Sequence, residues 1–133
     1  MPVSGIRYAI ARTTPLPFGE AVARVRGALA DEGFGVLCEI DVQATLEAKL
    51  EVEREPYLIL GACNPSLAHR ALSEEPEIGV LLPCNVVVHV EHGTTHVLAV
   101  DPRPLFELVG SGELAPVADD VRARLARVVD SVA

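Results

Sequence analysis

The chain has 133 residues, half of them hydrophobic but only 4% aromatic, and it contains no tryptophan. This length suffices for a single domain over 1–133 with a sizeable core, and that core must be built from Val, Leu, Ile and Ala. The formal net charge of -8, with one lysine and scattered arginines, argues against a nucleic-acid partner, because phosphate binding requires clustered basic residues.

No apolar run reaches the roughly 18 residues that span a bilayer, and the N-terminus lacks the regions of a signal peptide. We therefore expect a cytoplasmic protein with no membrane partner. The odd set Cys38, Cys63 and Cys84 follows no zinc-ribbon spacing, so free thiols are expected in a reducing compartment. No cofactor is expected.

The first third of the chain alternates strand and helix signals. A strand is predicted over 6–12, with Ile6, Tyr8 and Ile10 on one face. A helix follows and ends near Gly33, where glycine suits the left-handed C-terminal turn. A second strand is predicted over 35–40. The helix is indicated by apolar residues at steps of four, three and four: Phe18, Val22, Val25 and Leu29.

The middle of the chain carries two helix start signals. Asp41 can cap a short helix through Leu50, and Asn64 can cap a helix whose first residue is Pro65. Between them, 57–60 has no polar member, which predicts an interior strand covered on both faces. The apolar runs 78–82 and 86–90 then predict a long strand interrupted by Pro83.

A hairpin turn over 91–94, a return strand over 95–100 and a short helix over 101–108 complete the predicted core. This order favours an α+β two-layer sandwich, with a mixed or mainly antiparallel sheet and helices on one face. A doubly wound parallel sheet is the weaker alternative, because no glycine-rich phosphate turn follows any strand. A last helix over about 116–132 is expected to bury Val117, Val121, Leu125, Val128 and Val132.

Two separated motifs, Gly61-Ala62-Cys63-Asn64-Pro65 and Leu82-Pro83-Cys84-Asn85, resemble a family catalogued as domain of unknown function 302. The early Gly33-Phe34-Gly35-Val36 is similar to that family too. The resemblance covers about 5–108 and leaves the last helix outside. It implies a small two-layer sandwich, typically a bacterial or archaeal protein, with cysteines at Cys63 and Cys84 and no established reaction.

Cys63 is the strongest candidate for a reactive side chain in this sequence. It lies at a predicted strand end, just before a helix N-terminus, where the helix dipole favours a thiolate. Cys63 and Cys84 are thus candidate catalytic thiols, and on neighbouring strands they can approach each other as a dithiol or soft-metal pair. The alternative is a structural role without thiol chemistry, in which both are small buried side chains. No other catalytic group is indicated, so enzymatic activity is left open.

The histidines of the predicted hairpin offer a second metal hypothesis. His89 and His96 can face each other across it. With Cys63 and Cys84 they are weak candidates for metal ligands, and exposed imidazoles beside a polar turn are the preferred interpretation.

The leading hypothesis is a small binding module with a pocket formed by residues of the two Cys-Asn motifs. The alternatives are a thiol-based redox or nucleophilic enzyme using Cys63 with Cys84, and a structural domain without chemistry. A homodimer through a strand edge or the Val-rich final helix is compatible with each. The expected ligand-binding residues are Cys63, Asn64, Pro83, Cys84 and Asn85.

Overall fold

The computed structural model describes residues 5–133. Over this range five strands form one antiparallel sheet in the order β1-β5-β4-β3-β2. The predicted α+β class is confirmed. The elements are β1 (Ala9–Thr14), α1 (Phe18–Asp31), β2 (Gly35–Asp41), α2 (Val42–Leu50), β3 (Tyr57–Cys63), α3 (Pro65–Glu74), the 3-10 helix η1 (Pro76–Leu81), β4 (Cys84–Glu91), β5 (Thr94–Val100), α4 (Pro102–Glu107), the 3-10 helix η2 (Gly112–Leu114) and α5 (Ala115–Asp130).

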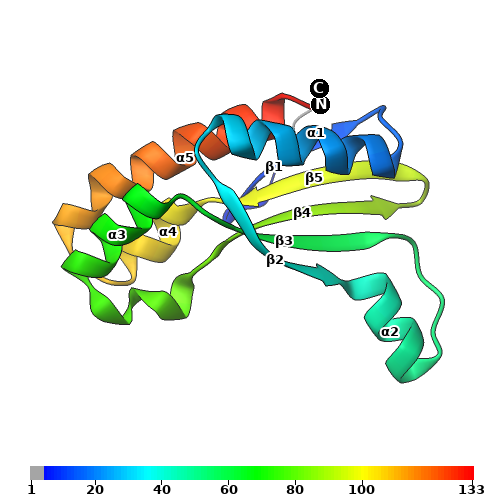
Figure 1. The fold of residues 1–133 in the computed structure, drawn as a ribbon, viewed down its shortest axis with the longest axis horizontal. Coiled ribbons are helices and arrows are strands. Elements are labelled where there is room, and N and C mark those ends of the chain that lie inside the picture. The colour runs from blue at the N-terminus through cyan, green and yellow to red at the C-terminus, as the bar shows by residue number, and fades with distance from the viewer. Residues whose placement is uncertain (1–4) are drawn as a thin grey trace.

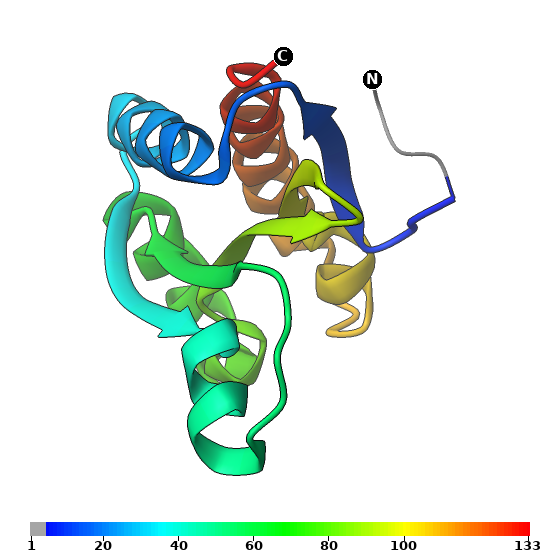
Figure 2. The same ribbon diagram turned by 90° about the vertical axis from the view of Figure 1, so that its right-hand side faces the viewer.

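The helices form a layer on one side of the sheet. Helices α1 and α5 lie over one face of the strands, and α3 and α4 continue the layer past one end of the sheet (Figure 1). Helix α2 projects from the opposite end, away from this layer (Figures 1 and 2). Alternate residues of the strands face the helices and are buried: Leu60, Ala62, Val86, Val88, Val97 and Ala99.

Two of the predicted helices bury the faces that the sequence indicates. In α1, Val25 and Leu29 are fully buried, and the chain leaves the helix through Gly33, whose φ of 83° is readily adopted by glycine. In α5 the expected stripe lies in the core: Val117, Val121, Leu125, Val128 and Val132.

The predicted caps and the hairpin are confirmed. Asp41 accepts a hydrogen bond from the Ala44 amide at 2.9 Å, and Asn64 accepts one from the Leu67 amide at 3.2 Å. Strands β4 and β5 are joined through His92 and Gly93, both at positive φ. The amides of these two residues donate to the Glu55 carboxylate, which fixes the turn against the segment before β3.

The strand predicted over 78–82 is wrong. This segment forms η1, in which Ile78 is buried but Val80 is 88% exposed. A short apolar run does not distinguish a strand from a helical turn by periodicity alone. Pro76, directly after the extended Glu75, occupies the first position of this turn. The sheet strand begins only after Pro83, at Cys84.

Two further expectations need correction. Strand β1 begins at Ala9 rather than residue 6, because its pairing with β5 runs from Ala9 to Thr14. Strand β3 is interior, as predicted, but it is not covered on both faces. Its residue Leu60, on the helix side, is fully buried, whereas Ile59, on the other face, is only partly buried. Over residues 5–133 the helix layer therefore covers one face of the sheet.

The final helix does not supply an exposed valine surface for a partner, because its valines pack into the core of the same chain. Helix α5 contacts β1, β5 and α1, and Thr14 donates a hydrogen bond to the Val132 carbonyl. Among residues 5–133, no helix has the length and apolar character to cross a membrane.

Candidate functional site

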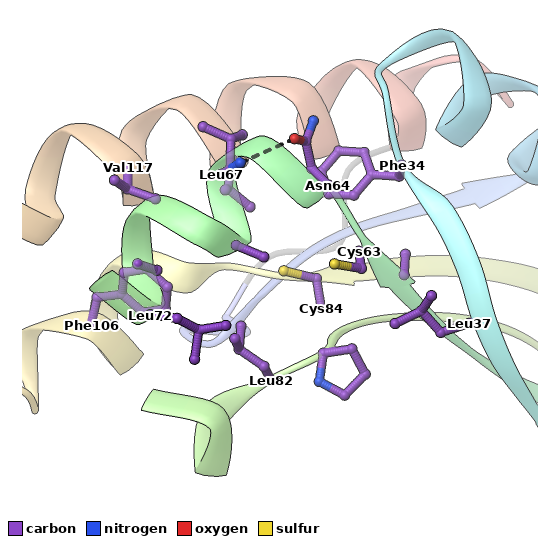
Figure 3. A pocket seen from close by; sticks show the side chains of 15 residues that line it. Phe34, Leu37, Cys63, Asn64, Leu67, Leu72, Leu82, Cys84, Phe106 and Val117 are labelled. Carbon is purple, nitrogen blue, oxygen red and sulfur yellow. Dashed lines mark hydrogen bonds between the residues drawn. The ribbon is translucent and has the colours of Figure 1, made fainter. Parts of the chain in front are cut away.

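A pocket of about 290 Å³ lies where the ends of β3 and β4 meet α3, α4 and α5. Figure 3 shows its side chains converging from these elements. Nearly all of the lining is aliphatic or aromatic, and the sulfur atoms and one amide are the exceptions. The lining residues are Phe34, Leu37, Ala62, Cys63, Asn64, Leu67, Ala68, Ala71, Leu72, Leu82, Pro83, Cys84, Phe106, Val117 and Val121.

Four of the five predicted ligand-binding residues line this pocket, namely Cys63, Asn64, Pro83 and Cys84. Asn85 does not. Cys84 pairs with Ala62 and faces the helices, so its neighbour Asn85 faces the other side by strand alternation. There the exposed Asn85 borders a shallow hollow on the uncovered face, and no side-chain hydrogen bond within 5–133 involves it.

The Asn64 side chain is held at both ends. Its Oδ1 caps α3 through the Leu67 amide, and its Nδ2 donates to the Glu32 carbonyl at 3.2 Å. Arg124 donates to the same carbonyl at 3.0 Å, which joins α5 to this turn. Hydrogen bonds from Arg127 lower the pKa of the Glu32 carboxyl. Asn64 therefore positions Cys63 and the start of α3.

The thiols of Cys63 and Cys84 enter the same pocket from neighbouring strands (Figure 3). Both are free. Burial, and secondly the proximity of Cys63, raise the pKa of the Cys84 thiol from 9.0 to about 11. At neutral pH about one Cys84 in ten thousand is then a thiolate. Cys84 alone is therefore a poor nucleophile at neutral pH.

Cys38 lies outside this pocket, on the edge strand β2, and is exposed. Its Sγ covers Gly61, where an added Cβ would lie 2.6 Å from that sulfur and 3.1 Å from Cγ of Pro83. Gly61 thus allows β2 and the Pro83 turn to close over the middle of β3. Cys38 provides a natural control thiol for experiments on the other two.

The hairpin histidines form a stack on the uncovered face of the sheet. His89 and His96 are paired across β4 and β5, with ring centroids 4.8 Å apart and planes 5° apart. Tyr57 stacks on the other side of His89 at 5.0 Å. Imidazole lone pairs lie in the ring planes, so parallel rings stacked face to face do not converge on one ion. Burial and the neighbouring His96 lower the pKa of His89.

The residues missed by sequence reasoning are those that the helices contribute to the pocket. Phe106 of α4 and Val117 and Val121 of α5 line it, although they are distant from the Cys-Asn motifs in sequence. Their apolar spacing predicts burial, and nothing in it indicates a pocket wall. Leu72 of α3 also lines the pocket and is 41% exposed.

Comparison with known proteins gave a family match and a structural match. A family model described as domain of unknown function DUF302 matches residues 10–132, a range that includes α5. A crystal structure described as an uncharacterized conserved protein DUF302 from Bacillus stearothermophilus is 32% identical, with a TM-score of 0.90. The match covers 96% of this chain and 100% of that one. No curated protein matches.

Proposed function

The chain belongs to the DUF302 family, and we propose that it is a small-ligand-binding module whose ligand occupies the pocket beside Cys63 and Cys84. The observation that carries this proposal is the pocket itself, which sits at the end of the sheet between three helices and has an almost wholly apolar wall. Concave, mainly apolar sites with a few polar groups are typical of small-molecule binding.

The lining favours a compact and largely apolar ligand. Its volume of about 290 Å³ lies near the lower end of the range of roughly 300–1,000 Å³ that is common for ligand pockets. The Asn64 amide is already engaged with Leu67 and Glu32, so it contributes little free hydrogen-bonding capacity. Leu37 and Leu72 extend the apolar pocket wall to the protein surface, where they are 68% and 41% exposed.

A pocket-filling substitution tests this function. Ala68 lines the pocket from α3 and is only partly buried, so Ala68→Phe should occupy the cavity without rebuilding the core. An anilinonaphthalene sulfonate dye should bind the native protein at one site, measured by fluorescence titration, and lose at least tenfold in affinity in this variant.

The matched control is Ala48→Phe, which adds the same ring at an exposed position on α2, remote from the pocket. It should leave dye binding unchanged. Equal dye affinity in the native protein and in Ala68→Phe, with both variants folded by circular dichroism, would rule out the pocket as the binding site.

We further propose that the protein is a cytoplasmic homodimer, formed through the uncovered sheet face and α2. Three free cysteines suit a reducing compartment.

Helix α2 buries no residue, and a nine-residue helix is marginal without packing. Ile40, just before this helix, and Leu50, its last residue, are 48% and 64% exposed. Light scattering should give twice the chain mass, and the chain mass in Ile40→Arg; a native protein of single-chain mass would refute the dimer.

A further inference from the structure

We infer that Cys63 and Cys84 together bind one soft monovalent cation, Cu(I), as two thiolate ligands at the sheet end of the pocket. The inference rests on the proposed function in that it uses the same pocket, and it adds a metal ion at the sulfur end of that pocket. Its basis is the convergence of two free thiols, from neighbouring strands, within an otherwise apolar wall.

The strand register brings the two cysteines together. Ala62 of β3 pairs with Cys84 of β4, so Cys63 is the next residue along β3. It is also the last residue of that strand, directly before the Asn64 cap. At this strand end both sulfur atoms turn into the pocket (Figure 3). Both sulfur ligands thereby come from residues that are paired in the sheet.

The number and type of donor atoms select the ion. Apart from the sulfurs, the side-chain polar group of the lining belongs to Asn64, which is hydrogen-bonded at both ends. Within residues 5–133, no group of three His, Cys, Asp or Glu side chains is placed to hold a metal. Zinc requires four ligands, usually tetrahedral. Cu(I) prefers soft thiolates and is satisfied by two of them in a linear arrangement.

The surroundings suit such a complex. Phe34, Leu82 and Phe106 contribute apolar surface to the pocket around the sulfurs. The bis-thiolate complex of Cu(I) carries one net negative charge. The ten-residue helix α3 begins just after Cys63 and presents its positive dipole end to that charge. On binding, two S–H bonds break, two S–Cu bonds form and two protons leave, with no change of oxidation state.

The test is an anaerobic titration with Cu(I) in competition with a chromophoric Cu(I) chelator. The native protein should take up one ion per chain. Cys63→Ser and Cys84→Ala should each weaken binding by more than about 100-fold, because loss of a ligand exceeds the 10- to 100-fold typical of outer-shell changes. Cys38→Ser, which alters the exposed thiol outside the pocket, should bind as the native protein does.

Equal copper affinity in the native protein and in the Cys63→Ser variant would overturn the inference, as would loss of binding in Cys38→Ser. A second readout needs no variant and so does not depend on variant folding. X-ray absorption of the native protein with one equivalent of copper should show two sulfur neighbours per copper. A single sulfur, or only nitrogen and oxygen neighbours, would contradict the site.

The dye experiment separates this inference from the proposed function. If copper does not bind but Ala68→Phe still weakens dye binding at least tenfold, the metal assignment fails and the apolar pocket function stands. If the dye fails to bind while copper binds as expected, the cysteine pair is the site and the apolar ligand class is wrong. Failure of both removes both proposals.

Discussion

The same dipeptide, Cys-Asn, occurs twice in this protein and is used in two different ways. Cys63-Asn64 ends a strand and starts a helix, and its asparagine is tied to Leu67 and Glu32. Cys84-Asn85 begins a strand, and its asparagine is exposed on the opposite face of the sheet. The two cysteines nevertheless reach the same pocket (Figure 3).

The difference shows that backbone context decides the role of each side chain. At the end of β3 the chain leaves the sheet, so consecutive residues Cys63 and Asn64 both remain on the pocket side. In β4 the extended backbone alternates, and Asn85 must face away from Cys84. We therefore expect the first pair to carry stability and position the site, whereas only the cysteine of the second pair contributes.

The largest expected effect is a pH-dependent loss of stability due to Cys84. Burial in the folded protein raises the pKa of its thiol to about 11, from 9.0 for a thiol that is not buried. Between these values the unfolded chain releases the thiol proton and the folded chain retains it, so stability is full below about pH 9 and falls as pH rises to about 11. At about 1.4 kcal/mol per unit, the fall should be roughly 3 kcal/mol.

Urea unfolding at several pH values from 8 to 11, followed by circular dichroism, measures this slope. Cys84→Ala should remove it, even if the variant is less stable overall, while Cys38→Ala should retain it because Cys38 is exposed. A native protein whose slope equals that of Cys84→Ala would show that the second cysteine is not buried as the structure places it.

Replacing Asn64 or Asn85 should change the free energy of unfolding by a smaller amount, and the two changes should differ. Asn64→Ala removes the α3 cap and the hydrogen bond to Glu32, each contributing about 1 kcal/mol, so unfolding should become about 2 kcal/mol easier. Asn85→Ala alters an exposed side chain and should change stability by less than about 0.5 kcal/mol. Asn64→Ser retains an oxygen acceptor and should fall between them.

Chemical unfolding of the three variants at pH 7 provides the measurement. Equal stability of Asn64→Ala and Asn85→Ala would mean that the two Cys-Asn pairs are equivalent after all. Far-ultraviolet circular dichroism of folded Asn64→Ala distinguishes a frayed α3 from a general loss of stability.

Sequence reasoning succeeded where the signal is local. Asp41 and Asn64 indicate helix starts because a cap needs only its own next turn. It failed at Ile78, where a run of five residues fits a strand or a helical turn equally well. Asn85 lies outside the pocket that Cys84 lines, because alternation along β4 turns consecutive side chains to opposite faces of the sheet.

For the same reason, sequence reasoning predicts only one wall of the pocket. The turns at its sheet end carry unusual residues, Cys63, Pro83 and Cys84, which attract notice. The opposite wall consists of ordinary core residues such as Phe106 and Val121. Their spacing predicts that they are buried, but which cavity they border is settled by the packing of α4 and α5 against α3, which leaves no local signal.

The smallest predicted effect concerns the face to which Asn85 points. His89 lies there between Tyr57 and His96, and burial, followed by repulsion from His96, lowers its pKa. In an NMR titration its midpoint should lie below the ordinary 6.5, and His96→Phe should raise it by removing the like charge while keeping a stacked ring. His69→Phe, at an exposed position of α3, should leave the His89 midpoint unchanged.

The same titration probes what covers this face. If a second copy packs on it, His89 is more deeply buried in the dimer than in the single chain, and dilution into the monomer should raise its midpoint toward 6.5, because burial disfavours the charged imidazole. A midpoint independent of protein concentration, in a sample that light scattering shows to dissociate, would place the dimer contact elsewhere. A native midpoint at or above 6.5 would show that the stack is open to water, and that the two faces of the sheet differ less than the structure indicates.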